Sequence, residues 1–134
     1  MSEVIVLDTH IWLWLIHGKT HLLSAQWRDR IEAAAVVGVS PVSCYEVALA
    51  AKRGRITLSK PLAEWFAVAL APAGIQFFPM DERVATQAVE LTPTHKDPFD
   101  RIIIATALVY QAKLASVDSL FSQYPELAGS LMQP

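Results

Sequence analysis

Short apolar runs alternate along the chain with longer segments whose apolar residues recur at helical spacing. The short runs are typical of buried strands, and they cover residues 4–7, 36–39, 75–78 and 114–117. The helical patterns cover residues 9–17, 24–35, 43–53, 59–72, 81–91 and 97–112. Short apolar strands that alternate with helices predict a parallel sheet with helices on both faces. We therefore expect a three-layer α/β/α domain whose parallel sheet has four or five strands.

The chain has 134 residues and no internal repeat, low-complexity stretch or linker, so we expect one domain over residues 1–134. Hydrophobic residues make up 53% of it and charged residues 18%, which excludes intrinsic disorder. None of its apolar runs approaches the ~20 residues that a membrane-spanning helix needs. The N-terminus lacks the basic region of a secretory signal and Cys44 is the single cysteine, so we expect a protein of the reducing cytoplasm.

Four of the 13 acidic residues lie where a solvated helix face does not explain them. Asp8 and Asp118 each follow the end of a predicted strand, whereas Glu46 and Asp100 lie in the first turn of predicted helices. Strand C-termini and helix N-termini share one edge of a parallel α/β sheet, and such folds bind their ligands at that edge. We therefore expect these four carboxylates to converge there, although they are far apart in sequence.

Converged carboxylates repel one another, at about 4 kcal/mol for a pair ~4 Å apart in an effective dielectric near 20. A protein can keep some of them protonated, or it can bind a hard cation. An all-oxygen cluster without cysteine or paired histidine favours Mg²⁺ or Mn²⁺ over zinc. Such an ion can activate water and hold a phosphate, so the cluster predicts metal-dependent phosphodiester hydrolysis.

Several acids also have a structural interpretation. Ser43 and Glu46 have the spacing of a capping box, in which Glu46 reaches back to the Ser43 amide. Asp97 is interpreted as a helix cap, which leaves Asp100, one turn further on, to face the cleft. Asp81 is interpreted as the cap of an ordinary amphipathic helix. Both interpretations of Glu46 stay open from the sequence.

The formal net charge of −2 argues against a generically basic protein that coats nucleic acids, but not against a nuclease that uses a metal ion. A small basic group of Lys52, Arg53 and Arg55 ends the third predicted helix. We interpret this group first as a solvated helix end and second as a contact for phosphate.

The helices predicted over residues 24–35 and 43–53 carry many apolar residues for a small domain, and Trp14 and Trp27 add large apolar surface nearby. Large exposed apolar patches usually mark interaction sites. We expect a groove between these two helices that receives an amphipathic segment of a partner protein. The alternative is that both tryptophans belong to the core.

Four short motifs carry the candidate carboxylates and follow one another along the chain. They are Leu7-Asp8-Thr9-His10-Ile11-Trp12-Leu13, Ser43-Cys44-Tyr45-Glu46, Asp97-Pro98-Phe99-Asp100-Arg101-Ile102 and Ser116-Val117-Asp118. In this order and at these spacings they resemble a PIN domain, in particular the VapC-type toxins of bacterial type II toxin–antitoxin systems. The resemblance extends from residue 4 to about residue 121.

The resemblance implies an endoribonuclease that depends on Mg²⁺ or Mn²⁺, that a cognate antitoxin protein inhibits, and that forms a homodimer. Carried over by position, the acidic quartet that binds the metal and acts in catalysis consists of Asp8, Glu46, Asp100 and Asp118. Thr9 and Ser116 match the small hydroxyl residues that support this quartet, and Arg101 matches an arginine common in the subgroup. The chain departs from the pattern at residues 125–134, where a fifth strand is expected but no strand pattern occurs.

Other functions make different demands on the sequence. A phosphatase of the haloacid dehalogenase type requires Asp-x-Asp after the first strand, and this chain has Asp8-Thr9-His10. A response-regulator receiver requires paired acids at the first strand and a lysine near the end of the last one. The alternatives that stay open are a PIN fold that only binds a partner, and a magnesium-dependent hydrolase of the phosphatase kind.

Overall fold

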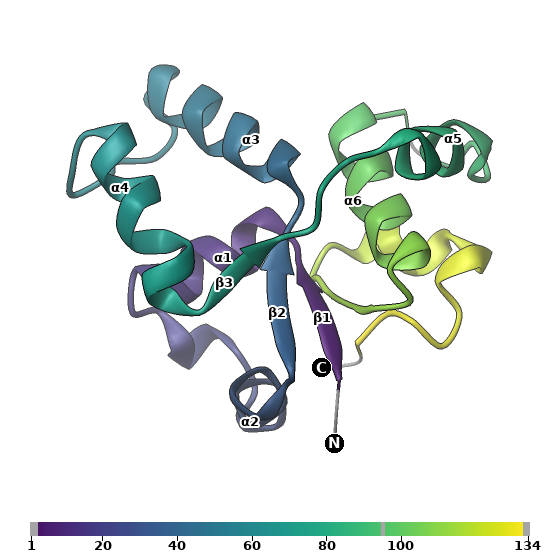
Figure 1. The fold of residues 1–134 in the computed structure, drawn as a ribbon, viewed down its shortest axis with the longest axis horizontal. Helices are drawn as coiled ribbons and strands as arrows, with labels where there is room; N and C mark the ends of the chain where they lie inside the picture. The colour runs from purple at the N-terminus through teal and green to yellow at the C-terminus, as the bar shows by residue number, and fades with distance from the viewer. Residues whose placement is uncertain (1–2, 95, 133–134) are drawn as a thin grey trace.

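A four-stranded parallel sheet forms the centre of the computed structural model, which describes residues 3–94 and 96–132 (Figure 1). The strands lie in the order β3-β2-β1-β4. Their bounds are β1 Val4–Leu7, β2 Val36–Val39, β3 Ile75–Phe77 and β4 Lys113–Ala115. All three neighbouring pairs are parallel. The predicted parallel α/β architecture is therefore confirmed.

Helices cover both faces of this sheet (Figure 1). The α-helices are α1 Thr9–Ile16, α2 Ala25–Ala33, α3 Pro41–Lys52, α4 Leu62–Ala69, α5 Glu82–Glu90 and α6 Pro98–Val109. Short 3-10 helices are η1 Thr20–Leu22, η2 Ala71–Ala73, η3 Ser119–Gln123 and η4 Pro125–Leu127. The sheet side of α1, α2 and α4 holds one part of the core, and the side of α6, η3 and η4 holds the other.

The two core halves follow from the alternation of side chains along β1. Ile5 and Leu7 point into the half beneath α1 and α4, and Val6 between them points into the half beneath α6. All three side chains are fully buried. A strand that is buried on both faces reads as a continuous apolar run, which explains why the pattern at residues 4–7 was a clear strand signal.

A close approach between β2 and the segment after β3 requires Gly38. A Cβ atom at this position would lie 2.5 Å from the Gln76 carbonyl oxygen and 2.7 Å from the Phe78 ring. Gly38 pairs with Val6 in the register of the sheet, and the Phe78 ring takes the space that a side chain at residue 38 would fill.

Helix α3 begins earlier than the sequence pattern predicted. Its N-cap is Ser40, whose hydroxyl accepts a hydrogen bond from the Val42 amide at 3.2 Å, and Pro41 is its first residue. The predicted capping box of Ser43 and Glu46 is wrong, because both residues lie inside the helix and Glu46 is in its second turn. Proline fixes a helical φ and needs no amide partner, so Ser40 and Pro41 start the helix instead of forming a turn.

The groove expected between the second and third predicted helices is also wrong. Helix α2 precedes β2 and α3 follows it, so the two helices lie at opposite ends of that strand (Figure 1). Trp27 is 1% exposed and belongs to the core, and Trp14 packs partly buried against the same core. The predicted caps Asp81 and Asp97 are each confirmed by a side-chain bond to a helix amide, and Ser24 caps α2 in the same way.

The C-terminal segment approaches β4 without forming a full strand. Leu114 and Leu131 form an isolated parallel bridge. The Leu114 amide donates to the Ser130 carbonyl at 2.8 Å, and the Met132 amide donates to the Leu114 carbonyl at 2.9 Å. The sheet thus has the four strands of the lower prediction, and its β4 edge is covered by one bridge.

None of the described helices has both the length and the apolar character of a membrane span.

Replacing Gly38 by alanine is expected to lower the free energy of unfolding by about 2 kcal/mol, because the new methyl group overlaps a backbone oxygen and a packed ring. Urea denaturation measures the change. Ala35→Ser, at an exposed position just before β2, is the control and should stay within about 0.5 kcal/mol of wild type. Equal stability of the two variants would contradict the close approach.

Candidate active site

The candidate site lies at the carboxyl edge of the sheet, where β1 and β4 end and where α3 and α6 begin. Asp8 follows β1 and is the N-cap of α1, and its amide donates to the Ala115 carbonyl at the end of β4 at 2.9 Å. Asp118 follows β4 and caps η3. Parallel pairing of β1 with β4 thus brings Asp8 and Asp118, which are 110 positions apart in sequence, to the same edge of the sheet.

Ser116 holds the two strand-end acids together. Asp8 is 7% exposed, and its carboxylate accepts from the Ser116 hydroxyl at 2.7 Å and from the Thr9 amide at 2.8 Å. The same Ser116 oxygen accepts from the Asp118 amide at 3.1 Å. Burial raises the pKa of Asp8, the two hydrogen bonds oppose that rise, and the Asp118 charge adds to it.

Thr9 joins α1 to α3 through Glu46. The Thr9 hydroxyl donates to Glu46 Oε1 at 2.6 Å and lies 2.8 Å from the hydroxyl of Ser43, which is fully buried. Because Thr9 has one hydroxyl hydrogen, Ser43 acts as donor to Thr9 in this arrangement. Ser43 is therefore a further supporting residue. Because α3 begins at Pro41, Ser43 lies inside the helix, on the same face as Glu46 three positions later.

The carboxylates interact electrostatically. Burial first, and then the charges of Asp8, Asp100 and Asp97, raise the pKa of Glu46 to about 7, while its bond from Thr9 opposes the rise. The mutual repulsion predicted from the sequence is thus present at Glu46. Asp97 is the acid that the sequence assigned only to capping; it caps α6 by accepting from the Phe99 amide at 2.9 Å, and it also lies beside this cluster.

Arg101 lies away from these acids. Its guanidinium donates to the carbonyls at the end of α5, among them Ala88 at 3.0 Å and Leu91 at 2.8 Å. Cations stabilise helix C-termini, so Arg101 fastens α5 against α6. It supports the helix that carries Asp100, and it does not extend into the cleft that Glu46 and Asp97 line.

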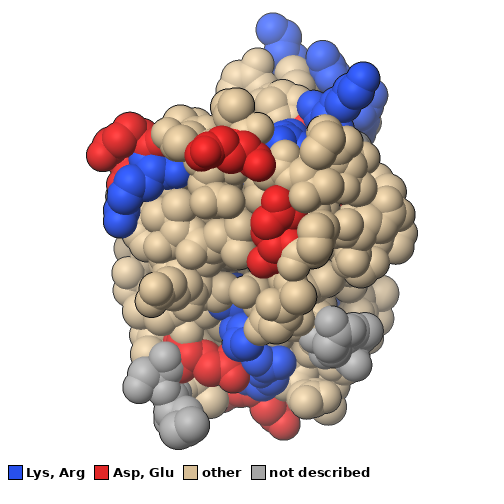
Figure 2. All heavy atoms as spheres, turned by 90° about the vertical axis from the view of Figure 1, so that its right-hand side faces the viewer, with Lys and Arg blue, Asp and Glu red and all other residues tan. Residues whose placement is uncertain are grey.

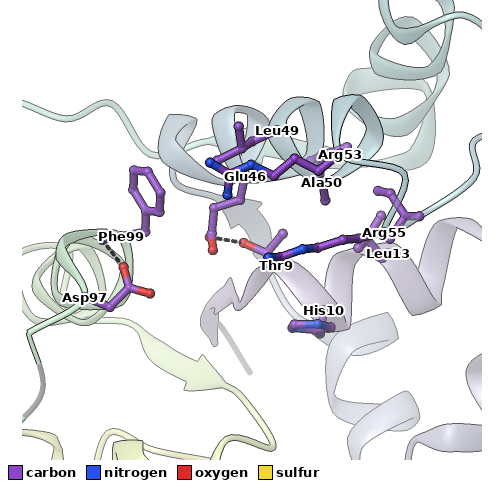
Figure 3. A pocket seen from close by; sticks show the side chains of 12 residues that line it. Thr9, His10, Leu13, Glu46, Leu49, Ala50, Arg53, Arg55, Asp97 and Phe99 are labelled. Carbon is purple, nitrogen blue, oxygen red and sulfur yellow. Dashed lines mark hydrogen bonds between the residues drawn. The ribbon is translucent and has the colours of Figure 1, made fainter.

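A cleft of about 380 Å³ opens beside the carboxylates (Figure 3). Glu46, Asp97 and Phe99 line one end of it, and Arg53 and Arg55 line the other. Its lining also includes Thr9, His10, Leu13, Val47, Leu49, Ala50 and Ile56. On the face drawn in Figure 2, basic side chains gather at the upper end of the molecule, and acidic side chains lie below them toward the middle and again near the lower end.

The aromatic rings of Tyr45 and Phe99 bridge the start of α3 to the start of α6. Their centroids are 5.2 Å apart, and Tyr45 is 58% exposed. This contact connects the helices that carry Glu46 and Asp100, so it helps to fix the separation of the two acids.

The donor chemistry at this edge fits a hard divalent cation. All four predicted ligands are carboxylates, and the charges of Asp8, Asp100 and Asp97 add to burial in raising the pKa of Glu46. Within residues 3–94 and 96–132, no three Asp, Glu, His or Cys side chains stand in the arrangement of a ready-made metal site.

Comparison with known proteins gives consistent results. A family model described as "PIN domain" matches residues 5–127. "Ribonuclease VapC22" of Mycobacterium tuberculosis is 30% identical over 115 residues, which cover 85% of this chain and 86% of that protein.

Two solved structures share the fold at low sequence identity. A VapBC2 complex from Rickettsia felis, bound to a DNA fragment from its promoter, superposes with a TM-score of 0.71 at 14% identity over 96% of this chain and 97% of the other. A toxin–antitoxin complex from Klebsiella pneumoniae gives a TM-score of 0.61 at 19% identity over 97% of both chains.

The raised pKa of Glu46 predicts a loss of stability in metal-free protein between about pH 4.5 and 7. In that window the folded protein binds more protons than the unfolded chain, so the free energy of unfolding falls as pH rises. Glu46→Gln should remove about 1 kcal/mol of this fall, after allowance for solvent screening at a half-buried group. Urea denaturation in the presence of a chelator measures it.

The control for this experiment is Glu64→Gln, at an exposed position on α4, which should follow the wild-type pH profile. If Glu46→Gln shows the same slope as wild type and Glu64→Gln, the assigned pKa is wrong.

Proposed function

The chain belongs to the PIN domain family, and from this premise we propose that it is an endoribonuclease that acts as the toxin of a type II toxin–antitoxin pair. The observation that carries the proposal is the group of carboxylates at the carboxyl edge of the sheet, beside an open cleft. The similarity to a protein named as a ribonuclease supports RNA as the substrate.

We assign Asp8, Glu46, Asp100 and Asp118 as the residues that hold Mg²⁺ or Mn²⁺. When bound, such an ion polarises the scissile phosphate and favours deprotonation of the attacking water. The protein's own contribution is to place Asp8 and Glu46 at one edge of the sheet, where Thr9 contacts both of them, and burial together with the neighbouring acidic charges raises the pKa of Glu46 there.

Hydroxyl groups do this positioning. The Ser116 hydroxyl donates to the Asp8 carboxylate and accepts from the Asp118 amide, and the Thr9 hydroxyl donates to Glu46. Arg101 acts at one remove, because it holds α5 against the helix that carries Asp100. Each of these residues acts by positioning the acids or the helices that carry them.

A protein antitoxin and a second copy of the chain are the proposed partners. Support for the antitoxin comes from the structural similarity to toxin–antitoxin complexes. The proposed activity takes place in the cytoplasm, where both the proposed substrate RNA and the antitoxin are made. The proposed toxin consists of one domain over residues 1–134.

Asp8→Asn is expected to abolish cleavage and to leave the melting temperature unchanged or higher. An asparagine keeps an acceptor for the Thr9 amide and a donor toward Ser116, and it removes one charge from a crowded group. Cleavage of a structured RNA in Mg²⁺, with and without chelator, and thermal melting are measured on the same samples.

Asp29→Asn, at an exposed position of α2, is the matched control and should keep full activity. A large loss of stability in Asp8→Asn together with retained cleavage would refute the assignment of Asp8.

Mg²⁺ or Mn²⁺ should raise the melting temperature, because a ligand that binds only the folded state adds about 2.7 kcal/mol at a hundredfold excess over its Kd. The variant Asp8→Asn/Glu46→Gln/Asp100→Asn/Asp118→Asn should show no such rise. Calorimetry of both proteins over a series of metal concentrations measures the difference. An equal rise in both would place the metal elsewhere in the protein.

A further inference from the structure

The basic end of the cleft is not explained by metal binding. Arg53 and Arg55 line the same cleft as Glu46 and Asp97. In Figure 3 both arginine side chains extend from the far end of the cleft in the direction of Glu46 and Thr9. The cleft therefore has an acidic end and a basic end within one continuous surface.

The way in which α3 ends brings both arginines to the cleft. Gly54 has a φ of 71°, a left-handed conformation that glycine adopts without steric cost. Its amide donates to the Ala51 carbonyl at 3.2 Å, and the Arg55 amide donates to the Ala50 carbonyl at 2.9 Å. This tight reversal turns the chain back at once, so residues 53 and 55 flank the same opening instead of diverging.

Neither arginine side chain is bonded to another group among the described residues. Within the described part of the chain, the guanidinium groups of Arg53 and Arg55 form no salt bridge and no hydrogen bond, and both residues are exposed. The salt bridges recorded there join Arg30 to Glu3 and Arg83 to Asp81, away from the cleft. Two unpaired guanidiniums beside an acidic cluster in a chain of net charge −2 are available to an anionic ligand.

We propose that Arg53 and Arg55 bind a phosphate of the substrate strand that neighbours the scissile phosphate, an inference that rests on the proposed ribonuclease function. Arg53 lies seven positions after Glu46, roughly 10 Å along the helix axis, and its side chain extends back in the direction of Glu46. A phosphate bound by the arginines would therefore lie next to the phosphate at the carboxylates. Phosphate contacts of this kind fix register without reading sequence.

This arrangement separates two kinds of phosphate contact. The acidic end repels every phosphate that a cation does not neutralise, whereas the basic end attracts phosphates without a cation. The exposed His10 also lines the cleft. The strand is thus anchored at the basic end, and only the phosphate to be cut lies at the acids.

The test compares two double variants that change the net charge equally, Arg53→Gln/Arg55→Gln and Arg28→Gln/Lys52→Gln. Arg28 lies on α2 at the other end of β2, and Lys52 is next to Arg53 in sequence but does not line the cleft. All are made in an Asp8→Asn background so that RNA is bound and not cut. Fluorescence anisotropy with a labelled single-stranded oligoribonucleotide of random sequence gives the Kd over a series of salt concentrations.

Loss of the two arginines should weaken binding roughly tenfold at ~0.1 M salt and lower the salt slope of log K by about 0.7–1.4, whereas the control pair should change both much less. In the cleaving protein the same pair should raise KM with little change in kcat. Equal effects of the two pairs would overturn the proposal, since only total charge would then matter.

Two further outcomes separate this proposal from others. If the Asp8→Asn protein binds no RNA at all and the wild type cuts none, the proposed function fails, and not the arginine assignment alone. If the arginine pair leaves RNA affinity unchanged but weakens binding of a co-expressed antitoxin, the arginines serve a protein partner and the proposal is overturned.

Discussion

Burial of acidic side chains at one edge of the sheet, together with the repulsion between them, is the constraint on which the rest of this structure depends. The acids could relax by turning outward to water, and the protein prevents this with short hydrogen bonds from neutral hydroxyls. Ser116 contacts Asp8 at 2.7 Å and Thr9 contacts Glu46 at 2.6 Å. Hydroxyls orient the carboxylates without cancelling their charge.

Outer contacts keep the helices that carry these acids in place. Arg101 closes the end of α5, and the carboxylate of Glu126 accepts from both the amide and the hydroxyl of Thr92, at 2.8 and 3.0 Å. These bonds join η4, the segment after α5, and α6 into one unit on that face of the sheet. The position of Asp100 thus depends on residues that lie far from the cleft.

The charged side chains of the cleft are distinguished by their positions and not by a large net charge. The chain as a whole is slightly acidic, yet one cleft holds acids at one end and free arginines at the other. Such separation places both signs of charge in one cleft without the protein becoming generally basic.

The sequence by itself determined the parallel sheet and the position of Asp8 directly after β1, since a short run buried on both faces is apolar throughout and ends at a polar residue. The strand predicted over residues 114–117 is Lys113–Ala115 in the structure, so Asp118 lies three positions beyond its end and caps η3. The resemblance carried by the four motifs pointed to the family that the comparisons confirm. The caps at Ser24, Asp81 and Asp97 were equally local.

The tertiary structure alone decided which of two serines starts α3, where α2 lies relative to α3, and where Arg53, Arg55 and Arg101 point. Ser40 and Ser43 are both acceptable caps, and only the packed helix, with Ser43 buried against Thr9, selects Ser40. An exposed arginine looks the same in a sequence whether it faces water, a helix end or a cleft. Its direction is set by long-range packing of segments that the local pattern does not relate to one another.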